Sequence, residues 1–333
     1  MTRTTSHLEI EILESRSVPA VVLSGGVLTI RGSVGSDTIV VSQSGGNVLV
    51  SGVGGAGLFA LSKVTSITIN GGFGNDTITN SLLTKPITIN GGDGNDTITS
   101  SGTSVTINGG DGNDTITSTA AGHVGISGGT GDDTITTSGA GAIINGGDGN
   151  DTITSTSTGY VSISGSTGDD TIASTNASRA VINGGSGDDI ITCNTTTTGL
   201  ANISGGDGND TIACSASSAI IDGGSGKDLI TCSTTILATI TGGSEDDTIT
   251  CSGTGSDIIS GGAGNDTIIG GFGHAQIDGG IGNDIITGRG VTGDTIRGGV
   301  GADTLTAQGG PSTLFVDHLD TLFIRIGDTV IFV

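Results

Sequence analysis

The segment Gly91–Thr99 reads GGDGNDTIT, and this nine-residue pattern decides the fold because it returns every 18 to 21 residues. The thirteen copies, five of them nearly identical and eight looser, begin at Gly71, Gly91, Gly109, Gly128, Gly146, Gly165, Gly184, Gly205, Gly223, Gly242, Gly261, Gly279 and Gly298. A short fixed period is the signature of a solenoid, in which each repeat forms one coil stacked on the last.

One coil runs from Gly91 to Asn108. Gly91, Gly92 and Gly94 can adopt positive φ angles that other residues resist, so the first half of the coil predicts a sharp turn. Residues 96–99 and 105–107 alternate polar and apolar side chains, which is typical of half-buried strands, and small residues between them form a second turn. The sequence therefore predicts an all-β fold, a parallel β-roll or β-solenoid of about 13–15 coils with two short strands in each.

Stacking the coils in register places isoleucines above one another in two interior ladders. The first ladder contains Ile78, Ile98, Ile116, Ile135, Ile153, Ile172, Ile191, Ile212, Ile230, Ile249 and Ile268. The second contains Ile69, Ile89, Ile107, Ile126, Ile144, Ile163, Ile182, Ile203, Ile221, Ile240, Ile259 and Ile277. We expect these ladders to form a thin core, since aromatic residues make up only 2% of the chain.

The regular spacing of the glycine-rich repeat divides the chain into four segments. We expect residues 1–26 to form a poorly ordered lead-in, residues 27–66 degenerate first coils, and residues 67–306 the roll itself. After Thr306 the rhythm stops and apolar segments follow, so residues 307–333 are predicted to cap the exposed strand edges at that end.

The charge balance favours cations as partners. Acidic residues outnumber basic ones 33 to 10, which gives a formal net charge of −23. Such a chain repels nucleic acid and anionic membranes. No apolar run approaches the ~20 residues of a membrane span, so membrane insertion is not expected.

The sixth position of the repeat is aspartate in every copy. These residues are Asp76, Asp96, Asp114, Asp133, Asp151, Asp170, Asp189, Asp210, Asp228, Asp247, Asp266, Asp284 and Asp303. Carboxylates stacked ~4.8 Å apart repel one another by ~3–4 kcal/mol per pair at an effective dielectric near 20. An oxygen-seeking divalent cation would relieve that repulsion, and calcium suits carboxylates beside flexible glycine carbonyls better than magnesium does. The alternative is that each aspartate only caps its own turn through backbone amides.

The pattern GGxGxDxUx, which covers Gly71 to Thr306, resembles the repeat of RTX (haemolysin-type) calcium-binding proteins. That resemblance implies a β-roll in which adjacent turns share each ion, with the thirteen aspartates and glycine carbonyls as ligands. The second half of most coils lacks the pattern here, so we expect about a dozen Ca²⁺ ions, mainly in one row. On the second edge of the predicted roll, opposite the glycine turns, partial motifs return at Gly253–Ile259 and Gly290–Ile296. They add Asp257 and Asp294 as candidate metal ligands.

The resemblance also implies a non-catalytic structural protein, secreted by a bacterium or held at its surface, that folds or is stabilised on binding extracellular calcium. No clustered histidines or HExxH motif indicate an enzyme. The acidic and apolar end Asp328–Val333 is similar to the tail that a type I exporter recognises, so an exporter or a cell-surface component is an expected partner. A second hypothesis is a non-catalytic partner or export carrier for an enzyme on another chain.

Two further columns leave alternatives open. Thr-x-Thr pairs such as Thr97 and Thr99 form outward ranks that resemble the surfaces of ice-binding or adhesive rods, although β-propensity on a solvated face also explains them. Four cysteines occupy the tenth position of consecutive coils, where they form either disulfides or a ladder of small buried apolar groups. These residues are Cys193, Cys214, Cys232 and Cys251.

Overall fold

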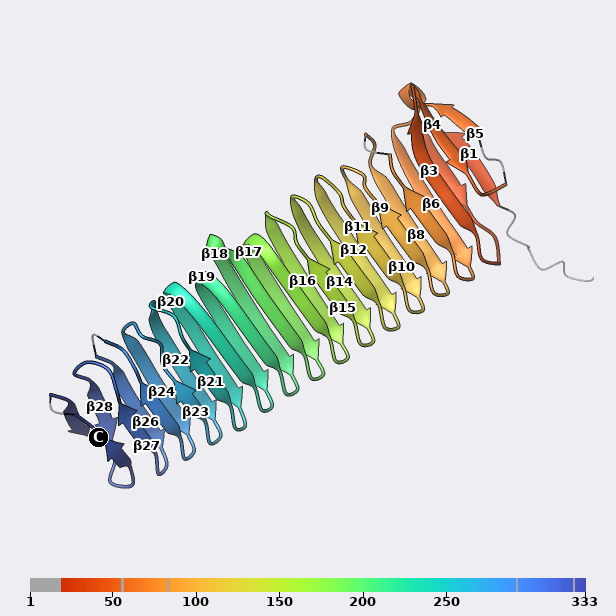
Figure 1. Ribbon diagram of the computed structural model, residues 1–333. Helices are drawn as coiled ribbons and strands as arrows, with labels where there is room; N and C mark the ends of the chain where they lie inside the picture. Colours follow the sequence, from red (N-terminus) through yellow and green to blue (C-terminus); the bar gives the residue numbers. More distant parts are fainter. Residues whose placement is uncertain (1–18, 55–56, 83, 292, 326) are drawn as a thin grey trace, which may run out of the picture.

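The protein is one long solenoid whose coils stack along a single axis, as the computed structural model shows (Figure 1). Residues 19–54, 57–82, 84–291, 293–325 and 327–333 are described, so residues 1–18 of the predicted lead-in lie outside this range. The fold contains about 14 turns and is all-β apart from one 3-10 turn, Leu61–Lys63. The predicted parallel β-solenoid is confirmed.

Each regular coil contributes one strand to each of two parallel faces. Strands that lead into the glycine turn form the first face: β6 (Ser66–Phe73), β8 (Ile87–Asp93), β10 (Val105–Asp111), β12 (His123–Thr130), β14 (Gly141–Asp148), β16 (Tyr160–Thr167), β22 (Ser256–Ala263), β24 (Ala275–Ile281) and β26 (Thr295–Val300). Strands that follow the turn form the second face: β7 (Thr77–Asn80), β9 (Thr97–Ser100), β11 (Thr115–Ser118), β13 (Thr134–Thr137), β15 (Thr152–Ser155), β21 (Thr248–Cys251), β23 (Thr267–Ile269), β25 (Ile285–Gly288) and β27 (Thr304–Ala307).

In the middle of the rod the two strands of a coil join into one continuous strand, which passes around the edge opposite the glycine turn (the far edge). The continuous strands are β17 (Thr171–Ser186), β18 (Ile190–Asp207), β19 (Thr211–Ser225) and β20 (Leu229–Ser244). The register between these neighbours shifts only along that far edge, for example between Asn194 and Leu200. The coils therefore vary from 18 to 21 residues without disturbing either face or the glycine turn.

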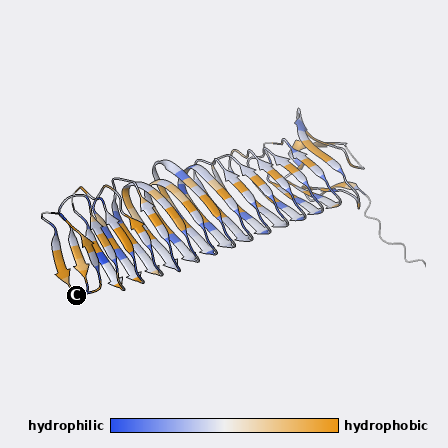
Figure 2. Cartoon of the chain, turned by 60° about the horizontal axis from the view of Figure 1, so that its bottom comes forward, coloured by the Kyte–Doolittle hydropathy of each residue, from blue (hydrophilic) through white to orange (hydrophobic). Residues whose placement is uncertain are grey.

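The register stacks identical side chains, as the sequence predicts. Ile98 pairs with Ile78 on one side and Ile116 on the other, while Ile107 pairs with Ile89 and Ile126. Both isoleucine ladders are almost fully buried and form one continuous core. Figure 2 shows the resulting apolar bands repeating from strand to strand along the rod. Each buried isoleucine side chain contributes roughly 1.5–3 kcal/mol of hydrophobic stabilisation.

The two ends of the solenoid are built differently. At the N-terminal end, β1 (Ala20–Ser24), β2 (Val27–Arg31), β3 (Thr38–Ser44), β4 (Asn47–Ser51) and β5 (Gly57–Ala60) include antiparallel pairs. From there β2 and β3 pair in parallel with β6 and β7 and start the two faces. At the other end β28 (Thr313–Val316), β29 (Thr321–Phe323) and β30 (Thr329–Phe332) continue the parallel pairing.

The described residues contain no helix long and apolar enough to cross a membrane.

Candidate metal centre

The glycine turn joins the two faces of every coil, and Gly109–Asp114 is representative. The amide of Gly112 donates to the carbonyl of Thr130 in the next coil at 2.7 Å. Gly110 has a φ of +124°, and a side chain on it would collide with the carbonyl oxygen of Gly92. Glycine is required there by both conformation and space, so the turns can stack as closely as the strands.

The sixth-position aspartates lie inside this turn and not on its outer surface. All thirteen are buried, with at most 2% of the residue surface exposed. The Oδ1 atom of Asp114 accepts a hydrogen bond of 2.7 Å from the amide of Asp96, and the amide of Asp114 donates in turn to Asp133. The same bond recurs at 2.7–2.9 Å between every successive pair of the thirteen.

The second carboxylate oxygen has no hydrogen-bond partner in any of the thirteen. Their Oδ2 atoms are buried and unpaired. A side chain built on Gly109 would collide with Oδ2 of Asp114 and with the carbonyl oxygen of Gly128 in the next coil, so both oxygens border one small space that only glycine leaves open. This arrangement returns in every copy except the last, where the space at Gly298 is bordered by Asp303 alone. A buried polar atom without a partner is costly, and thirteen in a row call for a ligand.

Two aspartates outside the thirteen terminate the row. The amide of Asp37 donates to Oδ1 of Asp76 at 2.7 Å. Its own Oδ2 atom accepts hydrogen bonds from the amide of Ser33 at 2.5 Å and from the Ser33 hydroxyl at 2.9 Å. At the other end Oδ1 of Asp320 accepts the amide of Asp303 at 3.1 Å, and its Oδ2 accepts the amide of Asp317 at 2.8 Å. Turn capping therefore describes these end residues, whereas the thirteen between them keep one oxygen unpaired.

The two second-edge aspartates differ from the row. Asp294 accepts amide hydrogen bonds on both oxygens, from Ala275 at 2.9 Å and Gly290 at 2.8 Å. Asp257 accepts a hydrogen bond from the hydroxyl of Thr234 at 3.4 Å. Since Asp257 pairs with Ala275, a coil without a carboxylate separates it from Asp294. Asp257 lies in strand β22 and Asp294 directly before β26, and neither has an unpaired buried oxygen among the described atoms.

Burial also raises the pKa of the carboxyl groups in the row. The pKa of Asp151 rises from 3.8 to about 6 and that of Asp170 to about 7, mainly through burial and further through neighbouring carboxylates. The hydrogen bond from the preceding coil opposes the rise. The direction is the same throughout the thirteen. The ionised form of these carboxyl groups is therefore disfavoured in the folded chain, and a bound cation would stabilise it.

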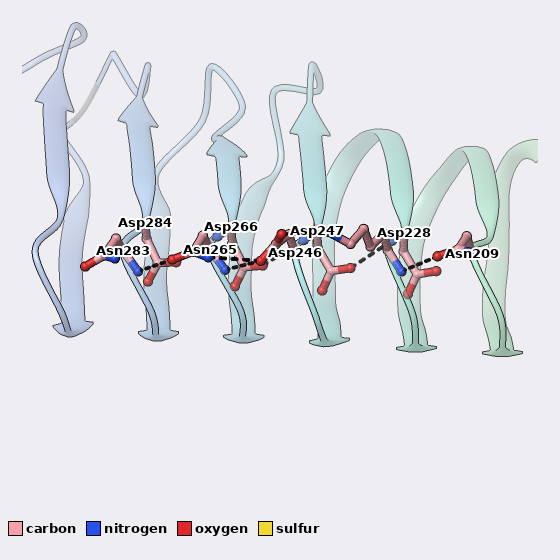
Figure 3. A network of polar contacts seen from close by, with 9 residues as sticks. Asn209, Asp228, Asp246, Asp247, Asn265, Asp266, Asn283 and Asp284 are labelled. Carbon is pink, nitrogen blue, oxygen red and sulfur yellow. Dashed lines mark hydrogen bonds and ion pairs between the residues drawn. The ribbon is translucent and has the colours of Figure 1, made fainter.

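A second side-chain ladder runs along the outer surface of the turn, at the fifth position of the repeat. In Figure 3 the amide of Asn265 donates to Asp246 at 2.8 Å, and that of Asn283 donates to Asn265 at 2.9 Å. These bonds run from the later coil to the earlier one, opposite in sense to those of the buried row. At Lys227 the ladder is interrupted, and its ammonium group forms an ion pair of 2.7 Å with Asp246.

Sequence reasoning missed this outer ladder, although asparagine or aspartate at the fifth position of most copies was the available signal.

The donor set fits calcium. The buried row offers only carboxylate and backbone carbonyl oxygens, which are the ligands of a hard cation. The described residues contain no group of three or more His, Cys, Asp or Glu side chains arranged around one point. An ion between two coils would therefore use one carboxylate from each coil and complete its coordination with backbone carbonyls.

Comparison with known families decides the assignment. The RTX calcium-binding nonapeptide repeat matches residues 68–79, 90–120, 126–153, 180–192, 197–230, 252–286, 276–291 and 289–310, which is more than half of the chain. The chain belongs to this RTX repeat family. The matched ranges contain eleven of the thirteen unpaired carboxylate oxygens, all but those of Asp170 and Asp247, so the family's calcium-binding character and the geometry of the row agree. Comparison with curated proteins and with solved structures gives no match.

Proposed function

We propose that this RTX protein is a calcium-stabilised structural rod that works outside the cell, secreted or at a bacterial surface. In this proposal the thirteen sixth-position aspartates hold about a dozen ions in one row. The observation that carries it is the set of thirteen buried Oδ2 atoms without partners, of which all but that of Asp303 lie beside a glycine carbonyl of the next coil. Extracellular calcium-binding modules typically have Kd values of ~0.1–1 mM. Such values suit a protein that stays weakly folded at the low calcium concentration inside the cell and folds stably at the higher concentration outside it.

The described ends of the rod support a capping role. Leu314 and Val316 are buried, and Leu322 and Val330 pack against the core. We propose that residues 307–333 close that end of the roll, and that their acidic and apolar tail is also the part an exporter recognises. Residues 27–66 close the other end as degenerate first coils.

A calcium titration followed by far-UV circular dichroism tests the main proposal. Starting from protein treated with EDTA, calcium is expected to raise the β signal and the midpoint of urea unfolding, whereas magnesium at equal concentration has little effect. Isothermal titration calorimetry should then give about a dozen sites per chain. If EDTA changes neither the spectrum nor the unfolding midpoint, and calorimetry detects no binding, the calcium row is refuted.

A second candidate function is supported by the threonine ranks. Thr97 pairs in register with Thr77 and Thr115, and Thr99 pairs with Thr79 and Thr117, so both ranks continue unbroken over neighbouring coils. A flat, regular hydroxyl surface of this kind suits contact with an ordered surface such as ice. Thermal hysteresis measured in saturating calcium tests it, because a rod without this function gives none.

A further inference from the structure

The four cysteines form a column inside the rod and belong to the same buried core as the isoleucine ladders, to which they add four thiols in a row. Cys214 pairs in register with Cys193 on one side and with Cys232 on the other, and Cys232 pairs with Cys251. All four thiols are free, and the residues are at most 5% exposed. In the preceding coils the same column holds serine, as at Ser155 and Ser174.

The strand spacing disfavours disulfides between these thiols. Adjacent parallel strands lie ~4.8 Å apart, and in-register residues keep their Cβ atoms at about that interval. A disulfide needs a Cβ to Cβ distance of roughly 3.5–4.5 Å. Bridging any neighbouring pair would therefore pull two coils together against the hydrogen bonds of both faces. Since the four residues lie in four consecutive coils, the structure keeps a straight row of reduced sulfur atoms.

The same spacing matches a metal that takes two sulfur ligands in a line. The zinc–thiolate bond of ~2.3 Å gives the scale of metal–sulfur bonds, so a linear S–metal–S unit spans roughly 4.6 Å, close to the strand repeat. Zinc demands a tetrahedron, which a straight row cannot supply. Thiolate ligands select soft ions such as Cu(I), whereas calcium and magnesium prefer oxygen. The column thus differs in chemistry from the carboxylate row on the glycine-turn edge.

We propose that this cysteine column is a binding site for soft monovalent cations of the Cu(I) or Ag(I) type. Cys193 and Cys214 hold one ion, and Cys232 and Cys251 hold a second. At each site two thiols lose their protons to solvent and form two metal–sulfur bonds, so one cation and two thiols give a complex of charge −1 and two released protons. No electron transfer is involved, because the ion arrives already in its monovalent state.

A positive charge lies at one end of the column. Arg289 donates a hydrogen bond of 2.8 Å to the carbonyl of Cys251, and it offsets the nearby carboxylate of Asp257 there.

Native mass spectrometry during titration with Ag⁺, in calcium and without chloride, tests the proposal. We expect two silver ions per chain, together with the ultraviolet absorption of silver–thiolate bonds. Two double variants then keep equal numbers of thiols in different positions. C193S/C214S keeps the neighbours Cys232 and Cys251 and should bind one ion. C214S/C232S keeps Cys193 and Cys251, which lie three coils apart, and should bind none.

Serine already occupies this column at Ser155 and Ser174, so both double variants should fold, which circular dichroism checks. Equal silver binding by the two variants would overturn the proposal, because the thiols would then act singly. Failure of the unaltered chain to bind silver would overturn it too, as would disulfides found in protein purified in air. Calcium binding is measured on the same samples, so a failure of this site is distinguishable from a failure of the carboxylate row.

Discussion

Replacing Asp151 with asparagine should change stability in opposite directions with and without calcium. Oδ1 of Asp151 accepts the amide of Asp133 at 2.8 Å, and asparagine retains that acceptor. The amide group takes the place of Oδ2, which is unpaired, and it faces the carbonyl oxygen of Gly165, to which it can donate. The substitution thus removes a buried charge while keeping the hydrogen bonds of the turn.

The magnitude without calcium follows from the carboxyl group's protonation. Its pKa is about 6 in the folded chain against an ordinary value of 3.8. Each pKa unit corresponds to about 1.4 kcal/mol, so at pH 7.5 the ionised carboxylate costs ~3 kcal/mol of folding free energy. In EDTA, Asp151→Asn should therefore be more stable than the unaltered chain by about that amount.

Calcium should reverse the order. Asp151 borders two intervals of the row, so the variant weakens two sites. With a Kd of ~0.1 mM, each site stabilises the fold by ~1.4 kcal/mol at 1 mM calcium and by ~2.7 kcal/mol at 10 mM. Losing two sites offsets the gain of ~3 kcal/mol near 1 mM calcium and exceeds it by ~2 kcal/mol at 10 mM. The variant should then be the less stable protein.

Urea unfolding at pH 7.5 in EDTA, 1 mM and 10 mM calcium measures this reversal. Asp93→Asn is the control, because it removes the same charge from an exposed side chain at the third position of another copy and should change stability by less than ~0.5 kcal/mol throughout. Equal destabilisation of Asp151→Asn in all three conditions would show that the carboxylate only caps its turn and does not bind calcium. A constant gain at every calcium level would exclude Asp151 as a ligand.

Three other changes test the space, the strain and the protonation of the turn. Gly109→Ala should cost ~1–3 kcal/mol in urea unfolding and remove calcium sites in calorimetry, because its Cβ meets the carboxylate of Asp114; equal calcium binding would contradict this. Glu245→Gly should raise stability by ~1 kcal/mol, since Glu245 has a φ of +80° where most copies have glycine, and an unchanged urea midpoint would refute the strain. The row's pKa values are raised in the fold, so the folded chain binds more protons than the unfolded one between pH 4 and 7. In EDTA the urea midpoint should therefore rise as the pH falls through this window, and a fall would contradict the assignment.

The coil could be predicted from the sequence because its determinants are local and repeated. The alternation around Ile98 and Ile107 fixes which side chains enter the core, and a constant period forces them into register. The glycine turn could also be predicted from the sequence, since few residues other than glycine tolerate positive φ. The inward direction of the cysteines follows from the same alternation, and their burial confirms it.

The details of the turn could not be predicted, because they depend on contacts between coils. Spacing alone does not show that Oδ1 of each aspartate accepts an amide from the preceding coil, or that Oδ2 stays unpaired. The outer ladder is hidden for the same reason, since asparagine at Asn95 looks like an ordinary turn residue. The segment Gly32–Val40 (GSVGSDTIV) is a looser relative of the repeat with Asp37 at its sixth position, whereas Asp320 lies in a segment without the motif, and only the structure aligns it with the row.

The two hydrogen-bond ladders of the glycine turn run in opposite directions along the rod. They distinguish the interactions that hold the coils in register from the contribution of calcium. Each coil donates an amide forward to the next buried carboxylate and another backward to the outer side chain, as at Asp96 and Asn95. Both bonds survive when the carboxyl group is protonated or replaced by an amide. Register therefore rests on the isoleucine core and on uncharged geometry, whereas the cation offsets only the cost of ionisation. Calcium should accordingly control how much of the chain is folded near neutral pH, and it should not change which strands pair.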